Sequence, residues 1–496
     1  MKKLLVLTLA ALMTLTACHA PDTPPLPEEP GPQQELPVPE DIPFQLAVYP
    51  EYSLHPVLAE NRANLALAPL LYEPLFALNA AFEAESVLCE SWTVSGDGLV
   101  WTLTLKPNIV FSDGTPLTGD IVAAALNTAR IGPSRFVSRL SGVTAVTGEG
   151  LTVTITLNAP NGNLPVLLDI PIALDDSPQP LGTGAYVLSG AGEELSLNAN
   201  PRRPDLPRPV DTIPLKAVHK SDELILSFES GDVALVDVDL MGTNSLGYSG
   251  SYETWDYATT SMLYLGFNTQ SGACRSPEVR QALAMGIDRE SIAQVDFAHH
   301  AVPAALPVHP NSPLYHAQTA RTLSYDPEGL MDRLAQLHLS GRTLRLLVNS
   351  ENAARVHAAE RIAQQLNWTG LELQVEKLAF EDYALALEKG DFDLYLAEVP
   401  LTADFDLSAL LLPGAQLNYG GWSDPDVSAL LTQFRSSQGT LRAIHAKALY
   451  AHLAQEVPIA PICFKNGSVL TRWGRLSGLE PVRGNVFYHL EGWNIA

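Results

Sequence analysis

The sequence predicts a mixed α/β protein, and two regions of the chain support that prediction. Between residues 326 and 398, segments with helical and with strand patterning alternate. Such a β-α-β-α-β succession is typical of a largely parallel sheet covered by helices. Between residues 92 and 157, short segments with period-two alternation indicate a separate β-rich block. No repeat of about 20–50 residues is evident, which argues against solenoids and propellers.

The first part of the folded region combines short strands with two helices. Strands are predicted at residues 44–49, 92–94, 98–105 and 150–157. Helices are predicted from apolar spacing at residues 63–76 and 118–129. Thr118 is suited to be the N-cap of the second helix, and Asp120 lies in its first turn. Mixed α/β structure with connectors rich in proline and glycine is expected at residues 171–257.

The second part predicts the alternating helices and strands of the main sheet. Strands are predicted at residues 262–268, 343–349, 371–378 and 392–398. Helices are predicted at residues 276–297, 326–339, 353–366 and 380–388. The first of these helices is expected to break after Ile287.

The N-terminus has the pattern of an export signal. Two lysines precede an apolar run that is too short for a permanent membrane helix, which needs about 20 residues. The run ends in Leu15-Thr16-Ala17-Cys18, which resembles the lipobox of bacterial lipoproteins. That resemblance implies a signal peptide of residues 1–17 that is removed, and a mature N-terminal Cys18 that carries acyl chains and anchors the protein. The alternative is an ordinary signal peptide with Cys18 near its cleavage site by chance.

Residues 18–43 are expected to form an extended tether. From Pro21 to Pro43 the chain is rich in proline and acidic residues and contains no lysine or arginine. Such a segment cannot bury apolar surface and favours a solvated, polyproline-like chain. It would hold the folded body away from the membrane.

Charge and cysteine content exclude several classes of function. The chain carries 30 basic and 55 acidic residues, a formal net charge of −25, which argues against nucleic-acid binding. Besides Cys18, three cysteines remain, Cys89, Cys274 and Cys463. Their odd number means that at least one is free, buried or paired with another molecule. Their wide spacing matches no metal site, and we expect no metal and no cofactor.

Five segments, taken in order, resemble the family 5 extracellular solute-binding proteins of ABC importers, which bind oligopeptides, dipeptides or nickel. The segments are Leu71–Phe76 (LYEPLF), residues 84–118 (with SWTVSGDG and FSDGTPLT), Gly182–Tyr186 (GTGAY), Tyr264–Ile292 (YLGFNT to GIDRESI) and Asn418–Leu431 (NYGGWSDPDVSALL). The resemblance extends from residue 44 to the C-terminus. Ala185 stands where proline is usual in the third segment.

This resemblance implies a two-lobe periplasmic-binding-protein-like fold of type II, in the large peptide-binder variant. Lobe I would comprise residues 44–260 and 466–496, with residues 77–168 as an inserted β-rich subdomain. Lobe II would comprise residues 261–465. The two crossings between the lobes would form a hinge that closes on the ligand.

The function implied is non-enzymatic. A membrane-anchored, monomeric protein would capture a peptide-like ligand between its lobes and deliver it to an ABC permease and ATPase. It would be exported and held by its lipid to the outer face of the cytoplasmic membrane, at the cell surface or in the periplasm. Alternatives are a nickel or other solute binder, a surface sensor, or an exported hydrolase. No HExxH, GxSxG or Cys/His signature supports the hydrolase.

Asp404 is the predicted partner of the ligand's ammonium group. In peptide binders of the family, a carboxylate in an ADY-like segment binds the free amino terminus, and Ala403-Asp404-Phe405 occupies that place. The usual following proline and the usual upstream Gly-Trp are absent. The alternative is that Asp404 only caps a helix at residues 405–412.

Six further residues are predicted to contact the ligand through the resemblance. Tyr49, Glu51 and Tyr52 lie in the segment of lobe I that contacts ligand in the family, and Asn418, Tyr419 and Trp422 would lie near the cleft rim. The alternative for the aromatic residues is core or interface packing.

Other polar residues are interpreted as structural. Arg280 and Asp288 are placed on one helix face as scaffold, and Tyr264 and Phe267 are expected in the core. Four histidines gather in a proline-rich connector, but no carboxylate or cysteine completes a known metal-ligand spacing there. These histidines are His299, His300, His309 and His316.

Overall fold

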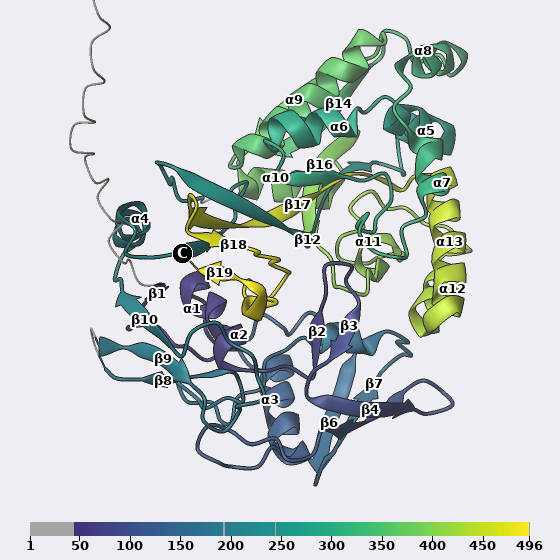
Figure 1. The fold of residues 1–496 in the computed structure, drawn as a ribbon. Helices are drawn as coiled ribbons and strands as arrows, with labels where there is room; N and C mark the ends of the chain where they lie inside the picture. Colours follow the sequence, from purple (N-terminus) through teal and green to yellow (C-terminus); the bar gives the residue numbers. More distant parts are fainter. Residues whose placement is uncertain (1–43, 192–193, 244, 496) are drawn as a thin grey trace, which may run out of the picture. The chain divides into compact units, whose positions relative to one another are not determined.

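The computed structural model describes residues 44–191, 194–243 and 245–495, and Figure 1 shows their fold. The predicted signal peptide (1–17), Cys18 and the tether (18–43) lie outside the described residues. Within the part of the chain that is described, no helix has the length and apolar character that a membrane crossing requires.

The body begins with a four-stranded sheet of order β1-β10-β9-β8. Its strands are β1 (Leu46–Val48), β8 (Tyr186–Ser189), β9 (Ser196–Ala199) and β10 (Thr212–Ala217). Helix α4 (Ser221–Ser230) follows β10. The helix predicted at residues 63–76 is wrong in its extent, since α1 (Arg62–Ala66) and α2 (Ala68–Leu71) take its place. Pro69, which lacks an N–H, lies in the first turn of α2 and explains the break.

An inserted β-rich unit follows. It contains a hairpin of β2 (Phe76–Leu78) and β3 (Ala84–Ser86), and a four-stranded antiparallel sheet of order β4-β5-β7-β6. The sheet strands and the α-helix of the unit are β4 (Cys89–Val94), β5 (Val100–Leu105), α3 (Gly119–Ile131), β6 (Val143–Glu149) and β7 (Thr152–Leu157). Thr118 caps α3 as predicted, accepting a hydrogen bond from the Ile121 N–H at 3.5 Å. The sequence did not predict β6.

The two ends of this inserted unit meet. Pro74 and Pro171 form an isolated antiparallel bridge, and the Ile172 N–H donates to the Glu73 carbonyl at 3.0 Å. The chain therefore enters and leaves the inserted unit at a single place, next to the four-stranded sheet of β1, β10, β9 and β8.

The largest sheet has seven strands, in the order β11-β17-β12-β16-β14-β15, with β13 also paired to β17. The strands are β11 (Leu235–Val238), β12 (Tyr252–Phe267), β13 (Ala301–Pro303), β14 (Thr343–Asn349), β15 (Glu372–Leu378), β16 (Leu394–Pro400) and β17 (Ile459–Arg472). The expectation of parallel pairing is confirmed for the three strands of the β-α-β-α-β succession, β14, β15 and β16, but it is wrong for the sheet as a whole. Only β14 pairs in parallel, with β15 and β16, whereas β12 and β17 pair antiparallel with their neighbours.

Helices cover this sheet where the sequence predicts them. They are α5 (Pro277–Met285), α6 (Arg289–Ser291), a π-helical turn (Ile292–Asp296), α8 (Pro327–Gln336), α9 (Ala353–Trp368) and α10 (Phe380–Lys389). Beyond β16 come α11 (Ser408–Leu411), α12 (Val427–Ser436) and α13 (Gly439–Glu456). The predicted break after Ile287 is confirmed, because Asp288 caps α6 by accepting from the Ser291 N–H at 3.1 Å.

Arg280 and Asp288 are structural, but they do not share a helix as predicted. Arg280 lies on α5 with 1% of its surface exposed, and its guanidinium donates to the carbonyls of Cys274, Arg275 and Val457. Arg280 thereby fastens α5 to the turn between α13 and β17. Tyr264 and Phe267 are buried in the core as expected.

β12 and β17 form a long antiparallel pair (Figure 1). Its register shifts at two places, between Ala258 and Met262 and between Leu263 and Tyr264. At the larger of these shifts, Thr259 to Ser261 lack regular partners on β17. The Thr260 hydroxyl donates instead to the Leu401 carbonyl at 2.6 Å. This irregularity in β12 falls at the predicted lobe boundaries, 260/261 and 465/466.

Two of the recognised sequence segments are held together by a buried ion pair. Glu73, of the LYEPLF segment, pairs with Arg203 and accepts from the Thr183 hydroxyl of the GTGAY segment at 2.8 Å. Gly184 is required for close approach, since a Cβ there would lie 2.5 Å from the Leu71 carbonyl carbon. The φ of Gly184 is not positive, unlike that of Gly114 at 98°, so of the two glycines only Gly114 has the left-handed backbone conformation that favours glycine.

All three cysteines of the body are free and buried. Burial raises the pKa of the Cys89 thiol to about 11 and that of Cys274 to about 12. The odd number of cysteines in the body therefore reflects three buried thiols in the core, which behave as small apolar side chains.

Candidate functional site

Three adjoining cavities form the candidate site. The tyrosine cavity, of about 410 Å³, lies against β1, α1, α4 and β11. The arginine cavity, of about 370 Å³, shares Arg62 and Asp237 with it. The Asp404 cavity, of about 530 Å³, shares Arg139 with the arginine cavity. The three cavities thus form a row that is lined by charged groups.

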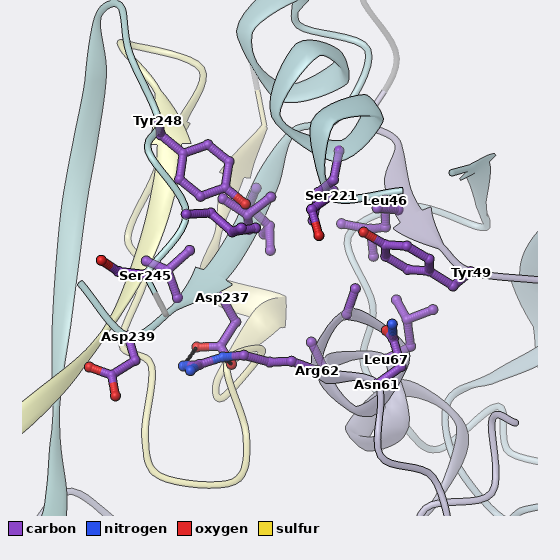
Figure 2. A pocket seen from close by; sticks show the side chains of 18 of the residues that line it. Leu46, Tyr49, Asn61, Arg62, Leu67, Ser221, Asp237, Asp239, Ser245 and Tyr248 are labelled. Carbon is purple, nitrogen blue, oxygen red and sulfur yellow. Dashed lines mark hydrogen bonds and ion pairs between the residues drawn. The ribbon is translucent and has the colours of Figure 1, made fainter. Parts of the chain in front are cut away.

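The tyrosine cavity has an aromatic and mostly apolar wall. Figure 2 shows Tyr49 and Tyr248 on opposite sides of it, with the Tyr49 phenol turned toward Ser221. Burial raises the pKa of Tyr49 and brings that of Tyr248 to about 12, so both phenols remain neutral donors at neutral pH. Tyr49 is the one predicted contact of lobe I that lines a cavity of this row.

Arg62 and Asp237 separate the first two cavities. The guanidinium makes two hydrogen bonds to the carboxylate, of 2.9 and 3.1 Å, and the Tyr257 hydroxyl donates to Asp237 at 2.8 Å (Figure 2 shows the Arg62–Asp237 pair). Burial disfavours the charged guanidinium, but the attraction of Asp237 outweighs it and the pKa of Arg62 is raised. Burial and the Asp237 charge together raise the pKa of Tyr257. The Asp237 carboxylate is therefore already fully engaged.

A group of three charged side chains adjoins the tyrosine cavity. The Lys465 ammonium lies 2.9 Å from Asp239, which lines the cavity, and 2.9 Å from Glu398. Burial disfavours the ammonium, but the two carboxylates outweigh it and raise the pKa of Lys465. This triad joins the loop after β11 to β16 and β17.

The arginine cavity is rich in positive charge. Besides the Arg62–Asp237 pair, it is lined by Arg135, Arg139 and Arg483 and by the carboxylate of Asp169. Arg139 pairs directly with Asp169, whereas the Arg483 Nη1 atom is 3.6 Å from it. Desolvation, and then the charge of Arg139, lower the pKa of Arg135 and of Arg483 to about 10. In a chain of net charge −25, this is an unusual concentration of guanidinium groups.

Asp404 lies in the third cavity with 3% of its surface exposed. Its Oδ2 accepts from the Asn161 side-chain amide at 2.9 Å, and its Oδ1 accepts from the Thr402 hydroxyl at 2.5 Å. Arg442 donates to the Asp404 carbonyl at 2.6 Å and holds the backbone in place. Phe405, next along the chain, has a φ of 54°, a conformation that L-residues rarely adopt. The carboxylate is therefore positioned by the surrounding structure rather than by a helix.

The Asn161 loop of the inserted unit contacts the region around Asp404 directly. The Gly162 N–H donates to the Arg435 carbonyl at 2.6 Å. A Cβ at Gly162 would lie 2.2 Å from the Ser437 carbonyl oxygen, so only glycine fits there. Asn161 and Asp404 are separated by 243 residues in the sequence, and this contact brings two distant segments to one cavity.

The alternative role of Asp404 as a helix cap is wrong. The following helix, α11, begins at Ser408, and Asp406 rather than Asp404 accepts from the Ser408 N–H, at 3.0 Å. The predicted helix at residues 405–412 is correspondingly shorter, because the positive φ of Phe405 is incompatible with a helix start there.

The other predicted contacts lie elsewhere. Glu51 is exposed and pairs with His219, and Tyr52 is 55% exposed with its ring against Tyr49. Asn418 holds a turn by donating to the Trp422 carbonyl at 2.8 Å and accepting from its N–H at 2.9 Å. Trp422 is buried, and Tyr419 packs edge-on against Tyr395. None of these five residues lines the three cavities, and a ligand role for them stays a prediction.

Three of the four clustered histidines contact a neighbouring side chain or backbone group in the structure. The fourth, His299, occupies a turn with a φ of 68°. His300 contacts Asp256 at 2.9 Å, and the His316 side chain accepts from the Thr319 N–H at 3.2 Å. His309 is fully buried against Phe82 and Phe464, and burial lowers its pKa to about 4. Among the residues described, no group of three His, Cys, Asp or Glu side chains could hold a metal ion.

The sequence reasoning missed Arg62, Arg139 and Asp237, which line or divide the cavities. A signal for Arg139 was present, since Arg135 and Arg139 are four residues apart around Phe136 in an acidic chain. A signal for Asp237 was the alternation Val236-Asp237-Val238-Asp239, which predicts two carboxylates on one side of an extended chain; β11 itself ends at Val238.

Comparison with known proteins gives a family match. The model of the bacterial extracellular solute-binding proteins, family 5 (middle region), matches residues 83–411. The chain is 26% identical over 347 residues to the glutathione-binding protein GsiB of Shigella flexneri serotype 5b, covering 65% of this chain and 67% of that protein.

Solved structures give a matching fold. The ABC transporter substrate-binding protein CtaP of Listeria monocytogenes superposes with a TM-score of 0.71 at 20% identity, covering 91% of this chain and 99% of that one. The oligopeptide-binding protein AppA of Bacillus subtilis, solved with a nonapeptide, superposes with a TM-score of 0.58 at 18% identity, covering 91% and 97%. These likenesses confirm the predicted α/β, two-lobe periplasmic-binding-protein-like fold of type II.

Proposed function

Because this chain belongs to family 5 of the bacterial extracellular solute-binding proteins, we propose that it captures a peptide-like ligand in the row of cavities. Proteins of this family bind solutes for ABC importers and are not enzymes, so the chain is a non-enzymatic solute-binding protein that acts outside the cytoplasm. The identity of the ligand and the mode of anchoring are the proposal.

The observation that supports a peptide-like ligand is the position of Asp404. Its carboxylate lines a cavity of about 530 Å³, a size suited to a small solute, and its Oδ2 is held only by the neutral amide of Asn161 among the described residues. A peptide's ammonium group buried there would lose its water, and a carboxylate compensates that loss best. The similarity to a glutathione-binding protein makes glutathione, a tripeptide with a free amine, one of the first solutes to test.

Ligand binding is expected to raise the melting temperature. Glutathione and individual tripeptides would be added in separate experiments. A ligand present at about 100 times its dissociation constant would stabilise the folded protein by about 2.7 kcal/mol through mass action. Differential scanning calorimetry measures this shift. No shift with any peptide, together with a shift produced by nickel, would contradict a peptide-like ligand and leave the family unchanged.

We further propose that the two lobes are residues 44–260 with 466–496 and residues 261–465, with 77–168 inserted in the first. The interrupted register of β12 against β17 supports a hinge at this place, because a break in ladder pairing lets two segments of a sheet rotate. Saturating ligand should therefore reduce the radius of gyration in small-angle scattering.

Anchoring through Cys18 is the remaining part of the proposal, and it rests on the sequence Leu15-Thr16-Ala17-Cys18. Cys18→Ser is expected to abolish labelling by fatty acid in cells and to move the protein to the soluble fraction, since the acylated thiol is lost. Undiminished fatty-acid labelling of the serine variant would contradict it. The anchored, monomeric protein would then deliver its ligand to an ABC permease and ATPase.

A further inference from the structure

The hairpin of β2 and β3 places one apolar side chain outside the core of the inserted unit. Phe82, at the tip of the hairpin, is 6% exposed, although its neighbours Ala80 and Glu83 are exposed. Phe82 belongs to a cluster of buried apolar side chains whose other members, among the described residues, all come from residues 262–464. The hairpin points toward the part of the fold that contains α11 (Figure 1). Phe82 therefore packs in the core of the proposed second lobe rather than in that of its own unit.

The socket that receives Phe82 consists of three aromatic rings. The Phe82 ring lies edge-on to that of Phe405, with the ring centres 5.3 Å apart, and its centre is 5.1 Å from that of His309. The Phe464 ring supports both, at 6.3 Å from Phe405 and 5.1 Å from His309. At most 1% of each socket residue is exposed. Aromatic contacts of this geometry stabilise beyond the apolar area that they bury, so this socket holds the hairpin to the second lobe.

The tip of the hairpin has a fixed backbone where it presents Phe82. The Asn79 side-chain oxygen accepts hydrogen bonds of 2.9 and 3.0 Å from two backbone N–H groups of the tip. Phe82 has a φ of 63°, which L-residues rarely adopt. From the opposite side, the Asn311 side-chain amide donates to the Ala80 carbonyl at 3.4 Å. A strained backbone persists only where surrounding contacts hold it, and here those contacts come from the socket.

The same contact surrounds the short segment that carries Asp404. Ala403 packs in the core cluster of the inserted unit, whereas Phe405 packs against Phe82 in the core of the second lobe. Between them, the Asp404 carboxylate accepts from Asn161 of the inserted unit. Each of the two parts thus places an apolar side chain in the core of the other, and the candidate ligand group lies where they interlock.

We propose that Phe82 is a latch between the inserted unit and the second lobe, and that it sets how often the site around Asp404 opens to a solute. This inference goes beyond the proposed function, because a latch acts on the entry of any solute. Its contacts join protein groups alone, so they favour the closed arrangement before a solute arrives. Burial of one phenylalanine side chain corresponds to about a tenfold or larger change in an equilibrium constant. A solute enters only the open arrangement, so the latch slows its association.

The test measures the radius of gyration of extensively dialysed protein, without added solute, by small-angle scattering. Phe82→Gly removes the latch side chain, and glycine suits the positive φ of this position, so the tip itself gains no strain. We expect a larger radius of gyration than that of the wild type. Phe82→Leu keeps an apolar side chain for the socket and should stay close to the wild type. Trp92→Ala removes an aromatic side chain of the same unit that is 43% exposed and packs on Phe76, and it should also remain compact.

A second measurement follows the binding of glutathione and of trialanine by stopped-flow fluorescence. Phe82→Gly should raise the association rate constant about threefold or more, because a larger fraction of the molecules is open when the solute arrives. Dissociation should also be faster, because the closed complex loses the same contact. A disturbance of the site alone would speed dissociation without speeding association, so the association rate separates a latch from a scaffold residue.

Each other outcome decides against the latch or against peptide capture separately. An unchanged radius of gyration in Phe82→Gly overturns the latch, with or without a lower melting temperature. An equal increase in Phe82→Gly and Trp92→Ala also overturns it, since it reports a general loosening of the inserted unit. A larger radius with wild-type association rates overturns the control of solute entry. If neither peptide binds the wild type, the proposed peptide capture fails, and the scattering comparison still decides whether Phe82 is a latch.

Discussion

Asp404→Asn is expected to weaken the binding of peptides with a free amino terminus by about 2–5 kcal/mol, as when one member of a buried ion pair is removed. The substitution keeps the shape of the side chain and one acceptor oxygen. It removes the charge that would face the ligand's ammonium group in the Asp404 cavity. Isothermal titration calorimetry with a free peptide and with its N-acetylated form measures the effect, and the acetylated peptide should bind the two proteins with similar, weak affinity.

The control for this prediction is Asp406→Asn. Asp406 lines the same cavity, but its carboxylate already accepts from the Ser408 N–H and hydroxyl and lies 3.4 Å from Arg435. Its substitution should therefore change peptide affinity much less. Asp404→Asn itself should cost about 1 kcal/mol of folding stability, because one of its hydrogen bonds, to Asn161 or to Thr402, is lost. Wild-type peptide affinity in Asp404→Asn would remove this residue from the site.

Arg203→Met is expected to destabilise the fold by about 3–5 kcal/mol, because it leaves Glu73 as an uncompensated buried charge. The side chain of Arg203 is 6% exposed and that of Glu73 is 12% exposed. Arg203 also donates to the Thr183 carbonyl at 2.9 Å, which loses its partner. Equilibrium unfolding in urea, monitored by circular dichroism, measures the change.

Two comparisons make this prediction specific. The double variant Arg203→Met with Glu73→Gln should be less destabilised than the sum of its single changes, since the residues interact directly. Arg345→Met removes an arginine that pairs with Glu376 and Asp391, and all three side chains are more than 40% exposed. Such a surface pair should cost about 0–1 kcal/mol. Equal effects of Arg203→Met and Arg345→Met would show that burial of the Glu73 pair has no energetic consequence.

Local patterning predicted most individual elements. β14 occupies residues 343–349 as predicted, and α10 begins at Phe380 as predicted, because alternation and helical spacing are properties of neighbouring residues. The errors arose where a local signal competed with apolar spacing. Pro69 divides the predicted helix at residues 63–76, and the positive φ of Phe405 prevents a helix at residues 405–412.

The direction of strand pairing and the composition of the site depended on contacts between residues that are distant in the chain. Local sequence patterns do not encode such contacts. β12 and β17 are about 200 residues apart in the chain, and their antiparallel pairing made the main sheet mixed. Asp404 was found through a motif, but its partner Asn161 lies 243 residues away. The arginine cavity combines Arg135 and Arg139 with Asp169 and with Arg483 near the C-terminus.

By itself, the sequence determined the family, the α/β class and most helices and strands, because motifs and hydrophobic periodicity reside in short stretches of chain. Only the tertiary structure decided that Asp404 is held by Asn161 rather than capping a helix, and that Arg139 and Arg483 lie beside Asp169. These arrangements depend on the pairing of distant strands, and side chains from distant segments become neighbours only when the chain has folded.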